Sequence, residues 1–403
     1  STHKQITKIP IIMYLLMKTK LKHPILTISK VMLGAGGLLM MTACSALSDG
    51  FSAKSQLIIE NSPNYKEGVF LNPIPVQESG FAKMLIEWIK GGENTAPDQP
   101  IVVENRSKED FLKLPESGLR ITWLGHATSL IEIDQTRLLI DPIWSERCSP
   151  FTWMGPKRFF QPPLAIEDLP EIDAVLISHD HFDHLDQVTL EKLSEKVMKF
   201  IVPLGVGSRL IKWGISEDKI TELDWWQQIK VGKVNITATP ARHFSGRSLL
   251  MTDRDATLWA GFAINGEKHN VYYTGDTGMF PGFKDIGEKL GPFDVTLIEV
   301  GAYNKLWADV HLGPEQAIQA VKMARGGLMI PVHWATFDLA MHSWTEPVER
   351  LLIAQQISKF PLSIPKPGQS IELKNPALLT KWWPKLPWQT VTEHQIVSSG
   401  LTD

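Results

Sequence analysis

Six consecutive residues, His179–His184, hold three imidazoles and two carboxylates, and this cluster constrains the chain more than any other feature. The apolar run at 174–177 directly before them predicts a buried strand, so the cluster leaves a strand end. Neutral imidazole and carboxylate are the ligands that suit zinc and related first-row cations. A His-rich surface turn is the alternative interpretation, and it leaves the further candidates downstream unexplained.

Three more candidate ligands follow predicted strands later in the chain. Residues 235–240 lead to His243, residues 271–274 lead to Asp276, and residues 327–330 lead to His333. A single His after a strand is usually an ordinary surface or core residue. In layered α/β proteins, however, functional groups gather where strands end, because the loops there converge on one crevice. Five His and two Asp suffice for two metal ions with one bridging carboxylate.

The run H-x-H-x-D-H with the later His, Asp and His resembles the metallo-β-lactamase superfamily. Over about residues 65–373 the chain is similar in particular to the N-acyl-phosphatidylethanolamine-hydrolysing phospholipase D family. The matching motifs are Phe70–Pro73, Thr122–Thr128, Met154–Phe159, Glu222–Trp226, Gly275–Gly278, Gly301–Tyr303, His311–Glu315, His333–Trp334 and Glu346–Pro347. The metal motif alone is specific only to the superfamily, and the combination with the other motifs is more specific.

The resemblance implies an α/β fold, a four-layer αββα sandwich, and it assigns roles to residues. The implied metal ligands are His179, His181 and His243 for one zinc ion, Asp183, His184 and His333 for the other, and Asp276 as the bridge. Asp183 is also expected to orient the nucleophile. His311 is expected to give a proton to the leaving group or to contact the phosphate, and a helix-capping or surface role is its alternative.

The implied activity is that of a dizinc phosphodiesterase. Metal-activated hydroxide would cleave N-acyl-phosphatidylethanolamine, or a related glycerophospholipid, into an N-acylethanolamine and phosphatidic acid. Iron or manganese in place of zinc stays open. A metal-dependent lactonase or β-lactamase-like hydrolase is the alternative enzyme, because one metal-binding fold hosts many reactions. A non-catalytic envelope metal-binding lipoprotein is the alternative outside enzymes.

Other residues near the motifs are candidates for supporting roles. Metal-bound imidazoles donate their second N–H to a fixed acceptor, for which Asp141, His126 and Thr128 are candidates. Each of the three is equally well explained as a turn residue. Lys157 and Arg158 are candidates for attracting a phosphate, although basic pairs are usually solvated.

The N-terminal segment has the build of an export signal. Residues 1–16 are interpreted as possible upstream sequence, and residues 17–43 as a signal peptide with a basic start and an apolar run at 31–41. Small residues before Cys44 resemble a bacterial lipoprotein signal, which predicts lipidation of Cys44. The apolar run is short for a membrane span. The expected location is therefore the bacterial cell envelope, anchored in a membrane, periplasmic or at the outer membrane.

Composition limits the partners. The net charge of −3 at 21% charged residues gives no basic footprint for nucleic acid, so phospholipid and a membrane surface are the expected partners. The oligomeric state stays open. With Cys44 lipidated only Cys148 would remain, which excludes a disulfide within the mature chain.

The rest of the chain divides into four expected parts: a linker at 44–64, an N-terminal arm at 65–114, the hydrolase domain at 115–374 and a Trp-rich tail at 375–403. The arm carries an apolar stripe at helical spacing over 81–89, which predicts a core-packing helix or a lipid contact. Helices are predicted at 187–199 and 314–324, and Trp225 and Trp226 are predicted in the core. For the tail, an interfacial anchor and packing onto the domain are equally favoured.

Overall fold

A computed structural model describes residues 53–77, 79–374 and 379–400 of the chain. The predicted signal peptide at 17–43 and the predicted lipidation site Cys44 lie outside these residues and stay predictions. Among the residues that the structure describes, no helix is both long and apolar enough to cross a membrane. Cys148 is buried as a free thiol.

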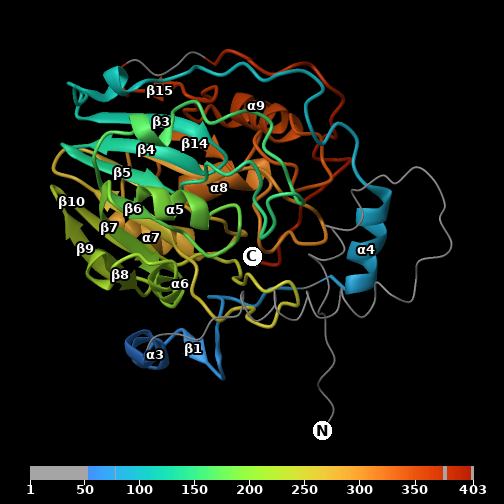
Figure 1. The fold of residues 1–403 in the computed structure, drawn as a ribbon. Helices are drawn as coiled ribbons and strands as arrows, with labels where there is room; N and C mark the ends of the chain where they lie inside the picture. Colours follow the sequence, from blue (N-terminus) through green and yellow to red (C-terminus); the bar gives the residue numbers. More distant parts are fainter. Residues whose placement is uncertain (1–52, 78, 375–378, 401–403) are drawn as a thin grey trace, which may run out of the picture.

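Two β-sheets form the body of the molecule (Figure 1). The first has seven strands in the order β15 (Ser370–Ile371), β3 (Leu119–Gly125), β4 (Thr128–Ile133), β5 (Thr136–Ile140), β6 (Ile172–Leu176), β7 (Val197–Pro203) and β8 (Ile220–Leu223). The second has six, in the order β14 (Leu328–Val332), β13 (Val295–Glu299), β12 (Asn270–Tyr273), β11 (Gly261–Asn265), β10 (Val234–Thr239) and β9 (Gln228–Val231). Neighbouring strands are parallel from β5 to β8 and from β12 to β14, and antiparallel elsewhere.

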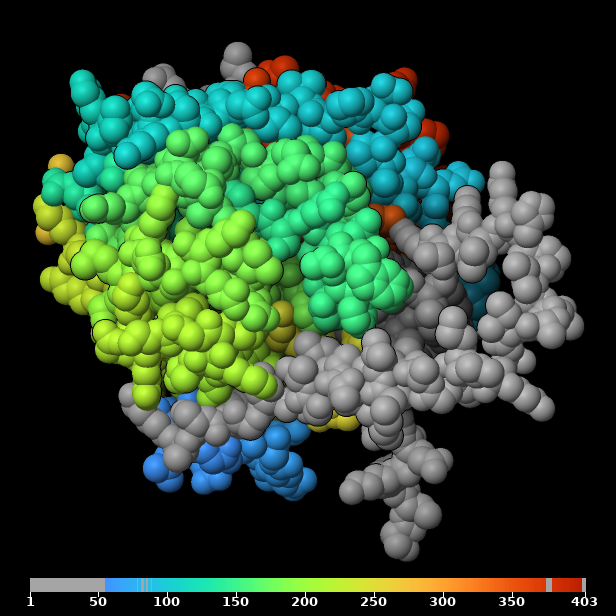
Figure 2. Space-filling model, viewed as in Figure 1, coloured from blue at the N-terminus to red at the C-terminus, as the bar shows by residue number. Residues whose placement is uncertain are grey.

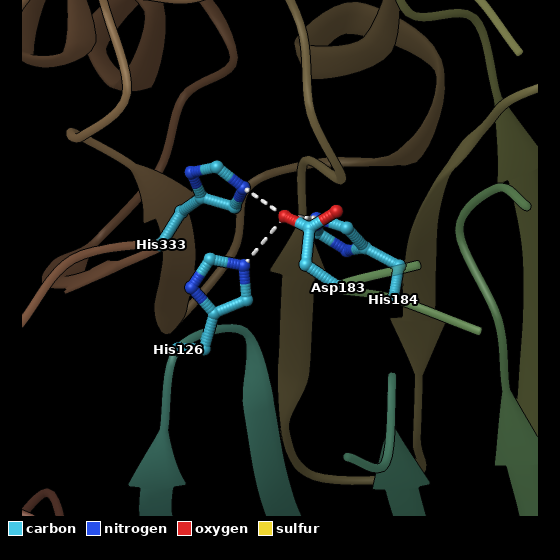
Figure 3. Close-up of side chains that lie close together, drawn as sticks. All are labelled: His126, Asp183, His184 and His333. Atoms are coloured by element: carbon cyan, nitrogen blue, oxygen red, sulfur yellow. Dashed lines mark hydrogen bonds and ion pairs between the residues drawn. The ribbon is translucent and has the colours of Figure 1, made fainter. Parts of the chain in front are cut away.

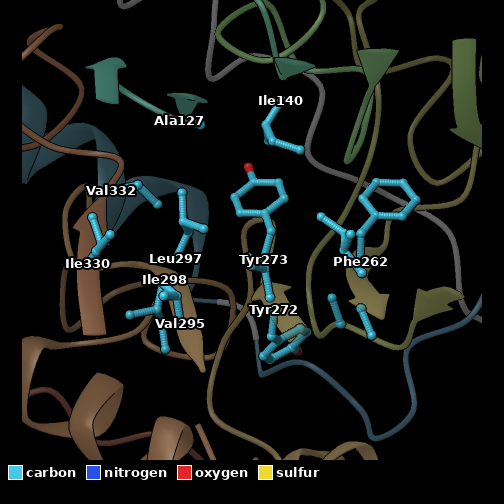
Figure 4. Packing of buried hydrophobic residues seen from close by; sticks show 14 of the residues in the cluster. Ala127, Ile140, Phe262, Tyr272, Tyr273, Val295, Leu297, Ile298, Ile330 and Val332 are labelled. Atoms are coloured by element: carbon cyan, nitrogen blue, oxygen red, sulfur yellow. The ribbon is translucent and has the colours of Figure 1, made fainter. Parts of the chain in front are cut away.

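Both faces of the central strands are buried, which explains their unbroken apolar sequences. In β5, Leu138 and Ile140 join the core between the two sheets, whereas Leu139 joins the core on the outer face of the first sheet. In β6, likewise, Leu176 joins the core between the sheets and Val175 joins the core on the outer face of the first sheet. Figure 4 shows part of the inner core, where side chains of β12, β13 and β14 face those of the first sheet.

Helices cover the outer faces. The short α5 (Gln187–Leu193) and α6 (Val206–Lys212) pack on the first sheet, while α7 (Gly282–Leu290), α8 (Pro314–Met323) and α9 (Glu346–Ser358) lie on the side of the second. Short 3₁₀ helices lie at Lys108–Phe111, Ile166–Asp168 and Glu217–Lys219. The predicted αββα sandwich is confirmed. The predicted helix at 187–199 is wrong at its end, because the chain turns after Leu193 and residues from Val197 onward pair as β7.

The N-terminal part packs against the sandwich and is not merely a linker. It contains α3 (Ala53–Glu60), β1 (Tyr65–Lys66), β2 (Val69–Phe70) and α4 (Phe81–Lys90), the last standing to one side in Figure 1. Ile59 of α3 is fully buried, and Ser62 and Asn64 each donate a 2.7 Å hydrogen bond to Asp224. On α4, Ile86 and Ile89 are 52% and 64% exposed, so these two side chains do not pack in a core.

The structure decides between the interpretations of several tryptophans, and one of them, Trp226, differs from its prediction. In the tail, Trp383 is buried and donates to Glu349, and the Trp382 ring lies 5.1 Å from that of Trp334. Packing onto the domain therefore accounts for these two residues, and an interfacial anchor does not. Trp225 is buried as predicted, but Trp226 is 37% exposed under Lys289, so its assignment to the core is wrong.

Candidate metal centre

The candidate residues leave strand ends and meet at one edge of the sandwich. His126 follows β3, Asp141 follows β5, the run 179–184 follows β6, His243 follows β10, Asp276 follows β12 and His333 follows β14. The backbones of His126, Asp141 and His333 are left-handed, with φ of 51°, 37° and 64°. Non-glycine residues rarely adopt this conformation, and such strain concentrates at functional sites. The sharp turns aim these three side chains out of their strands.

Three imidazoles form the first cluster, and they are the three predicted to share one ion. His181 Nδ1 lies 2.8 Å from His179 Nε2 and 3.2 Å from His243 Nε2. Around a tetrahedral zinc ion with bonds of about 2.0–2.1 Å, ligand atoms lie about 3.3 Å apart. The spacing of the three nitrogens therefore suits a common metal ion.

The second cluster gathers around Asp183 (Figure 3). Asp183 Oδ2 lies 3.2 Å from His333 Nε2 and 3.3 Å from His184 Nε2, as the predicted ligand set requires. His126 Nε2 is closer, at 2.8 Å. His126 thus belongs to this cluster as a fourth group, whereas the sequence indicated it only as an acceptor behind an imidazole.

Asp276 lies between the two clusters. Its Oδ2 is 3.0 Å from His333 Nε2 and 3.2 Å from His184 Nε2 in the second cluster. The same oxygen is 3.9 Å from Nε2 of both His179 and His243 in the first. One carboxylate oxygen within reach of both groups is the geometry of a bridging ligand.

The donor set fits divalent cations. His184 Nε2 and Asp276 Oδ1 are buried without a hydrogen-bond partner, which is costly unless another group satisfies them. Burial lowers the pKa of His179 and His243 well below the usual value and that of His181 to about 4, which keeps all three neutral, as ligation requires. In the second cluster, burial alone would lower the pKa of His333. The carboxylates of Asp276 and Asp183 outweigh this effect and raise the pKa to about 10. A cation would take the place of that proton.

Buried hydrogen bonds on the side of His184 away from Asp183 and Asp276 orient its ring in the second cluster. Asp141 Oδ2 accepts from His184 Nδ1 at 2.7 Å, from Ser178 Oγ at 2.6 Å and from the Tyr273 hydroxyl at 2.5 Å. Figure 4 shows the Tyr273 ring crossing between the sheets with its hydroxyl toward the end of β5. Asp141 therefore has the supporting role that was one of its two interpretations. Thr128 does not, because its hydroxyl donates to the backbone carbonyl of Asp141 and so holds the turn.

The N-terminal arm holds His243 in position. Its Nδ1 lies 2.9 Å from the carbonyl oxygen of Val310, while Asn72 accepts from the backbone N–H of His243 at 2.9 Å and donates to its carbonyl at 2.7 Å. Sequence reasoning missed this role of Asn72. The motif Phe70–Pro73 was the only signal, because nothing local links Asn72 to a loop 171 residues later.

Asp183 and His311 face the open side of the site. Their side chains are 16% and 13% exposed, against 3% or less for Asp276, His184 and His333. His311 Nδ1 is 2.7 Å from Glu299 Oε2 and 4.0 Å from Asp276 Oδ2, so His311 lies beside the clusters as predicted.

Glu299 is a further residue that the sequence did not reveal. It is fully buried at the end of β13, and burial raises the pKa of its carboxyl group. Its other oxygen accepts from the backbone N–H of Thr277 at 2.6 Å. An acidic residue directly after the buried, mostly apolar run Val295–Ile298 was the signal that could have identified it.

The two residues of the predicted basic pair, Lys157 and Arg158, have different environments. Lys157 is exposed and pairs with Glu146 at 2.6 Å, whereas Arg158 is buried between the rings of Phe160 and Phe337. Neither contacts the ligand clusters directly in the residues described.

Comparisons with known proteins agree with this geometry. Residues 136–334 match the family model of the beta-lactamase superfamily domain. An uncharacterised protein of Mycobacterium tuberculosis is 43% identical over 341 residues, which are 82% of this chain and 90% of that protein. The N-acyl-phosphatidylethanolamine-hydrolyzing phospholipase D 1 of Caenorhabditis elegans is 38% identical over 63% of this chain and 74% of its own length. A metal-dependent hydrolase of Methanosarcina mazei is 30% identical over 64% of this chain and 100% of its own length.

The family resemblance inferred from the motifs is therefore confirmed. The residues matched by the family model, 136–334, span the strand ends that carry the candidate ligands from Asp141 to His333. The chain belongs to the metallo-β-lactamase superfamily and is a metal-dependent hydrolase.

Proposed function

We propose that this hydrolase is a two-metal phosphodiesterase that acts on N-acyl-phosphatidylethanolamine or a related glycerophospholipid. The observation that carries the proposal is the location of Asp276 Oδ2, within 4 Å of imidazoles from both clusters. Two bridged ions are suited to a phosphodiester, whose negative charge resists attack. The similarity to the Caenorhabditis elegans phospholipase D supports the lipid as the substrate.

The residues would divide the chemistry among them. His179, His181 and His243 would hold one zinc ion, Asp183, His184 and His333 the other, and Asp276 would join them. Such a pair supplies hydroxide near neutral pH and neutralises the charge of the phosphodiester. Asp183, as the most exposed of the carboxylates in the clusters, is available to accept a hydrogen bond from the attacking water.

The bond that breaks joins phosphorus to the ethanolamine oxygen. Water contributes its OH to phosphorus, which gives phosphatidic acid, and a proton to the leaving oxygen, which gives the N-acylethanolamine. His311 is suited to deliver that proton from Nε2. Its Nδ1 faces the buried Glu299 carboxyl group, which holds the ring in one orientation.

Incubation of the purified, zinc-loaded protein with vesicles of N-acyl-phosphatidylethanolamine in phosphatidylcholine tests the proposal. We expect N-acylethanolamine and phosphatidic acid in equal amounts, measured by mass spectrometry, and little hydrolysis of phosphatidylcholine. Parallel reactions with lactones test the alternative enzyme. Turnover of lactones without turnover of the phospholipid would reject the proposal. Sedimentation of the protein with the same vesicles reports on the proposed membrane partner.

Replacing His311 by Gln tests the role proposed for its proton. An alkoxide leaving group needs protonation, whereas p-nitrophenolate leaves without it. We therefore expect kcat for the phospholipid to fall by about a hundredfold and kcat for bis(p-nitrophenyl) phosphate to change much less. His269→Gln is the matched control, since His269 pairs with Asp134 in a turn outside the ligand clusters. An equal loss on both substrates would assign His311 a positioning role instead.

A further inference from the structure

A pocket of about 750 Å³ lies between two segments outside the candidate metal centre. One wall is residues 96–100 of the N-terminal arm, and the other is the loop Arg147–Phe159, seen in teal-green on the surface in Figure 2. Backbone hydrogen bonds brace this loop, from Arg158 N to the Glu146 carbonyl and from Cys148 N to the Pro156 carbonyl. The volume of the pocket is that of a small-molecule binding site.

Arg158 lines this pocket and lacks the partners that a buried guanidinium needs. It is 6% exposed, and two of its three nitrogens, Nε and Nη1, are buried without a hydrogen-bond acceptor. The third, Nη2, reaches the Ile143 carbonyl only at 3.5 Å. Burial lowers the pKa of Arg158 to about 10, so it remains charged at neutral pH. A buried charge of this kind is paired in almost all proteins.

Groups of the chain that surround Arg158 do not satisfy it. The rings of Phe160 and Phe337 lie 5.9 Å and 5.7 Å from the guanidinium carbon, but a cation–π contact supplies no oxygen acceptor for the N–H groups. Asp186 already accepts from the backbone N–H of Ser145 at 2.9 Å and from the hydroxyls of Ser145 and Thr189. No ion pair of Arg158 is present among the described residues.

The charged side chains of the pocket nearly balance, but two guanidinium groups keep donors without an acceptor. Arg147 also lines it and has a buried Nε without an acceptor, and Lys157 is paired with Glu146 outside the lining. Asp98 and Asp338 are the acidic members of the wall. With Lys157 neutralised by Glu146, the donors that favour an anionic ligand are the unsatisfied Nε of Arg147 and the unsatisfied Nε and Nη1 of Arg158.

The rest of the wall is apolar, and the pocket adjoins the metal centre. Pro97, Pro100, Met154 and Phe159 line it, together with Trp153, which is 69% exposed. The ring of Phe337 packs both on Arg158 and on His126, with its centroid 5.3 Å from the His126 ring. One aromatic side chain thus separates the guanidinium from the second cluster.

We propose that this pocket binds an oxyanion that carries an apolar chain, a phosphate monoester or a carboxylate, with Arg158 as the anchor of the anion. The guanidinium fork matches either anion through two parallel hydrogen bonds. The site is separate from the one that hydrolyses the phosphodiester, and it does not depend on the identity of that substrate.

Isothermal titration with octyl phosphate, octanoate, inorganic phosphate and octyl glucoside tests the pocket. The full chain is used with Asp276→Asn as background, because that change weakens anion binding at the metal centre and leaves the pocket intact. We expect octyl phosphate or octanoate to bind, and Arg158→Gln to weaken that binding at least about tenfold. The uncharged octyl glucoside is expected to bind more weakly than both. Inorganic phosphate that binds as tightly as octyl phosphate would identify the free anion as the ligand.

Two further variants keep the test decisive. Lys157→Gln is the matched control, since Lys157 is exposed and already paired, and it is expected to change the affinity less than twofold. Met154→Trp fills the pocket from its apolar wall and is expected to block binding even if Arg158→Gln does not fold. Unchanged affinity in Arg158→Gln or in Met154→Trp, or equal affinity for octyl glucoside, would overturn the proposal.

Discussion

Replacement of Asp276 by Asn is expected to lower kcat/KM for phosphodiester hydrolysis by about a thousandfold, because metal ions contribute several kcal/mol to transition-state stabilisation and each 1.36 kcal/mol is a factor of ten. The amide has the size of the carboxylate but lacks its charge. Asp276 Oδ2 is the atom nearest to imidazoles of both clusters, at 3.0 and 3.2 Å on one side and 3.9 Å on the other. Among the described residues, the other cluster carboxylate, Asp183, has ion-pair contacts only with imidazoles of the second cluster.

Metal content is the second measurement on this variant. Elemental analysis is expected to show the loss of at least one equivalent of metal per chain relative to the native protein. Asp285→Asn on the exposed surface of α7 is the matched control and should leave both metal content and activity unchanged. Full hydrolysis by Asp276→Asn with depleted metal would mean that the ions are not the catalyst.

The convergence of the candidate ligands could be predicted from the sequence because these residues obey a local rule. Asp276 and His333 each come shortly after an apolar run, and His243 comes after the alternating strand β10. Because β10, β12 and β14 run in the same direction, their carboxyl ends meet at one edge of the second sheet. The alternation of Leu138, Leu139 and Ile140 between two cores likewise follows from the two-residue period of a strand. These features depend only on residues close together in the chain.

What the sequence did not reveal depends on contacts between distant segments. Glu299 looks like an ordinary polar end of a strand until His311 is placed 2.7 Å away, and Asn72 has no visible role until the arm returns to His243. The end of α5 was misjudged for another reason. No Gly or Pro separates Leu193 from Val197, so the pattern gave no sign of the turn between helix and strand.

Asp180, which lies between two candidate ligands in the H-D-H run, is expected to contribute to stability through a buried ion pair. It is fully buried, and Arg209 contacts its Oδ2 through Nε at 2.9 Å and Nη2 at 2.6 Å. Its Oδ1 accepts from the backbone N–H of Gly246 at 2.8 Å. These contacts tie the loop after β6 to the loop after β10, which carries His243.

Asp180→Asn is expected to lower the free energy of unfolding by about 3 kcal/mol, the low end of the range for breaking a buried ion pair, because Arg209 keeps its second partner, Asp253, at 3.0 Å. Chemical denaturation measures this loss, and the exposed Glu195→Gln should stay within about 0.5 kcal/mol of the native protein. In a double-mutant cycle with Arg209→Met, the combined loss should be smaller than the sum of the single losses. Additive losses would show that the pair is not coupled.

The pH dependence gives an independent check of the same ion pair. Burial alone would raise the pKa of Asp180, but Arg209, with smaller contributions from His181, the Gly246 N–H and Arg247, holds it below the ordinary value of 3.8. A carboxyl group whose pKa is lowered by folding stabilises the protein above its unfolded pKa, and this contribution is lost as the pH falls through the folded pKa. The native protein and Asp180→Asn should therefore differ by a constant amount above about pH 5 and converge below pH 3.8. A difference that stays the same down to the lowest pH at which both fold would mean that the charge of Asp180 contributes nothing.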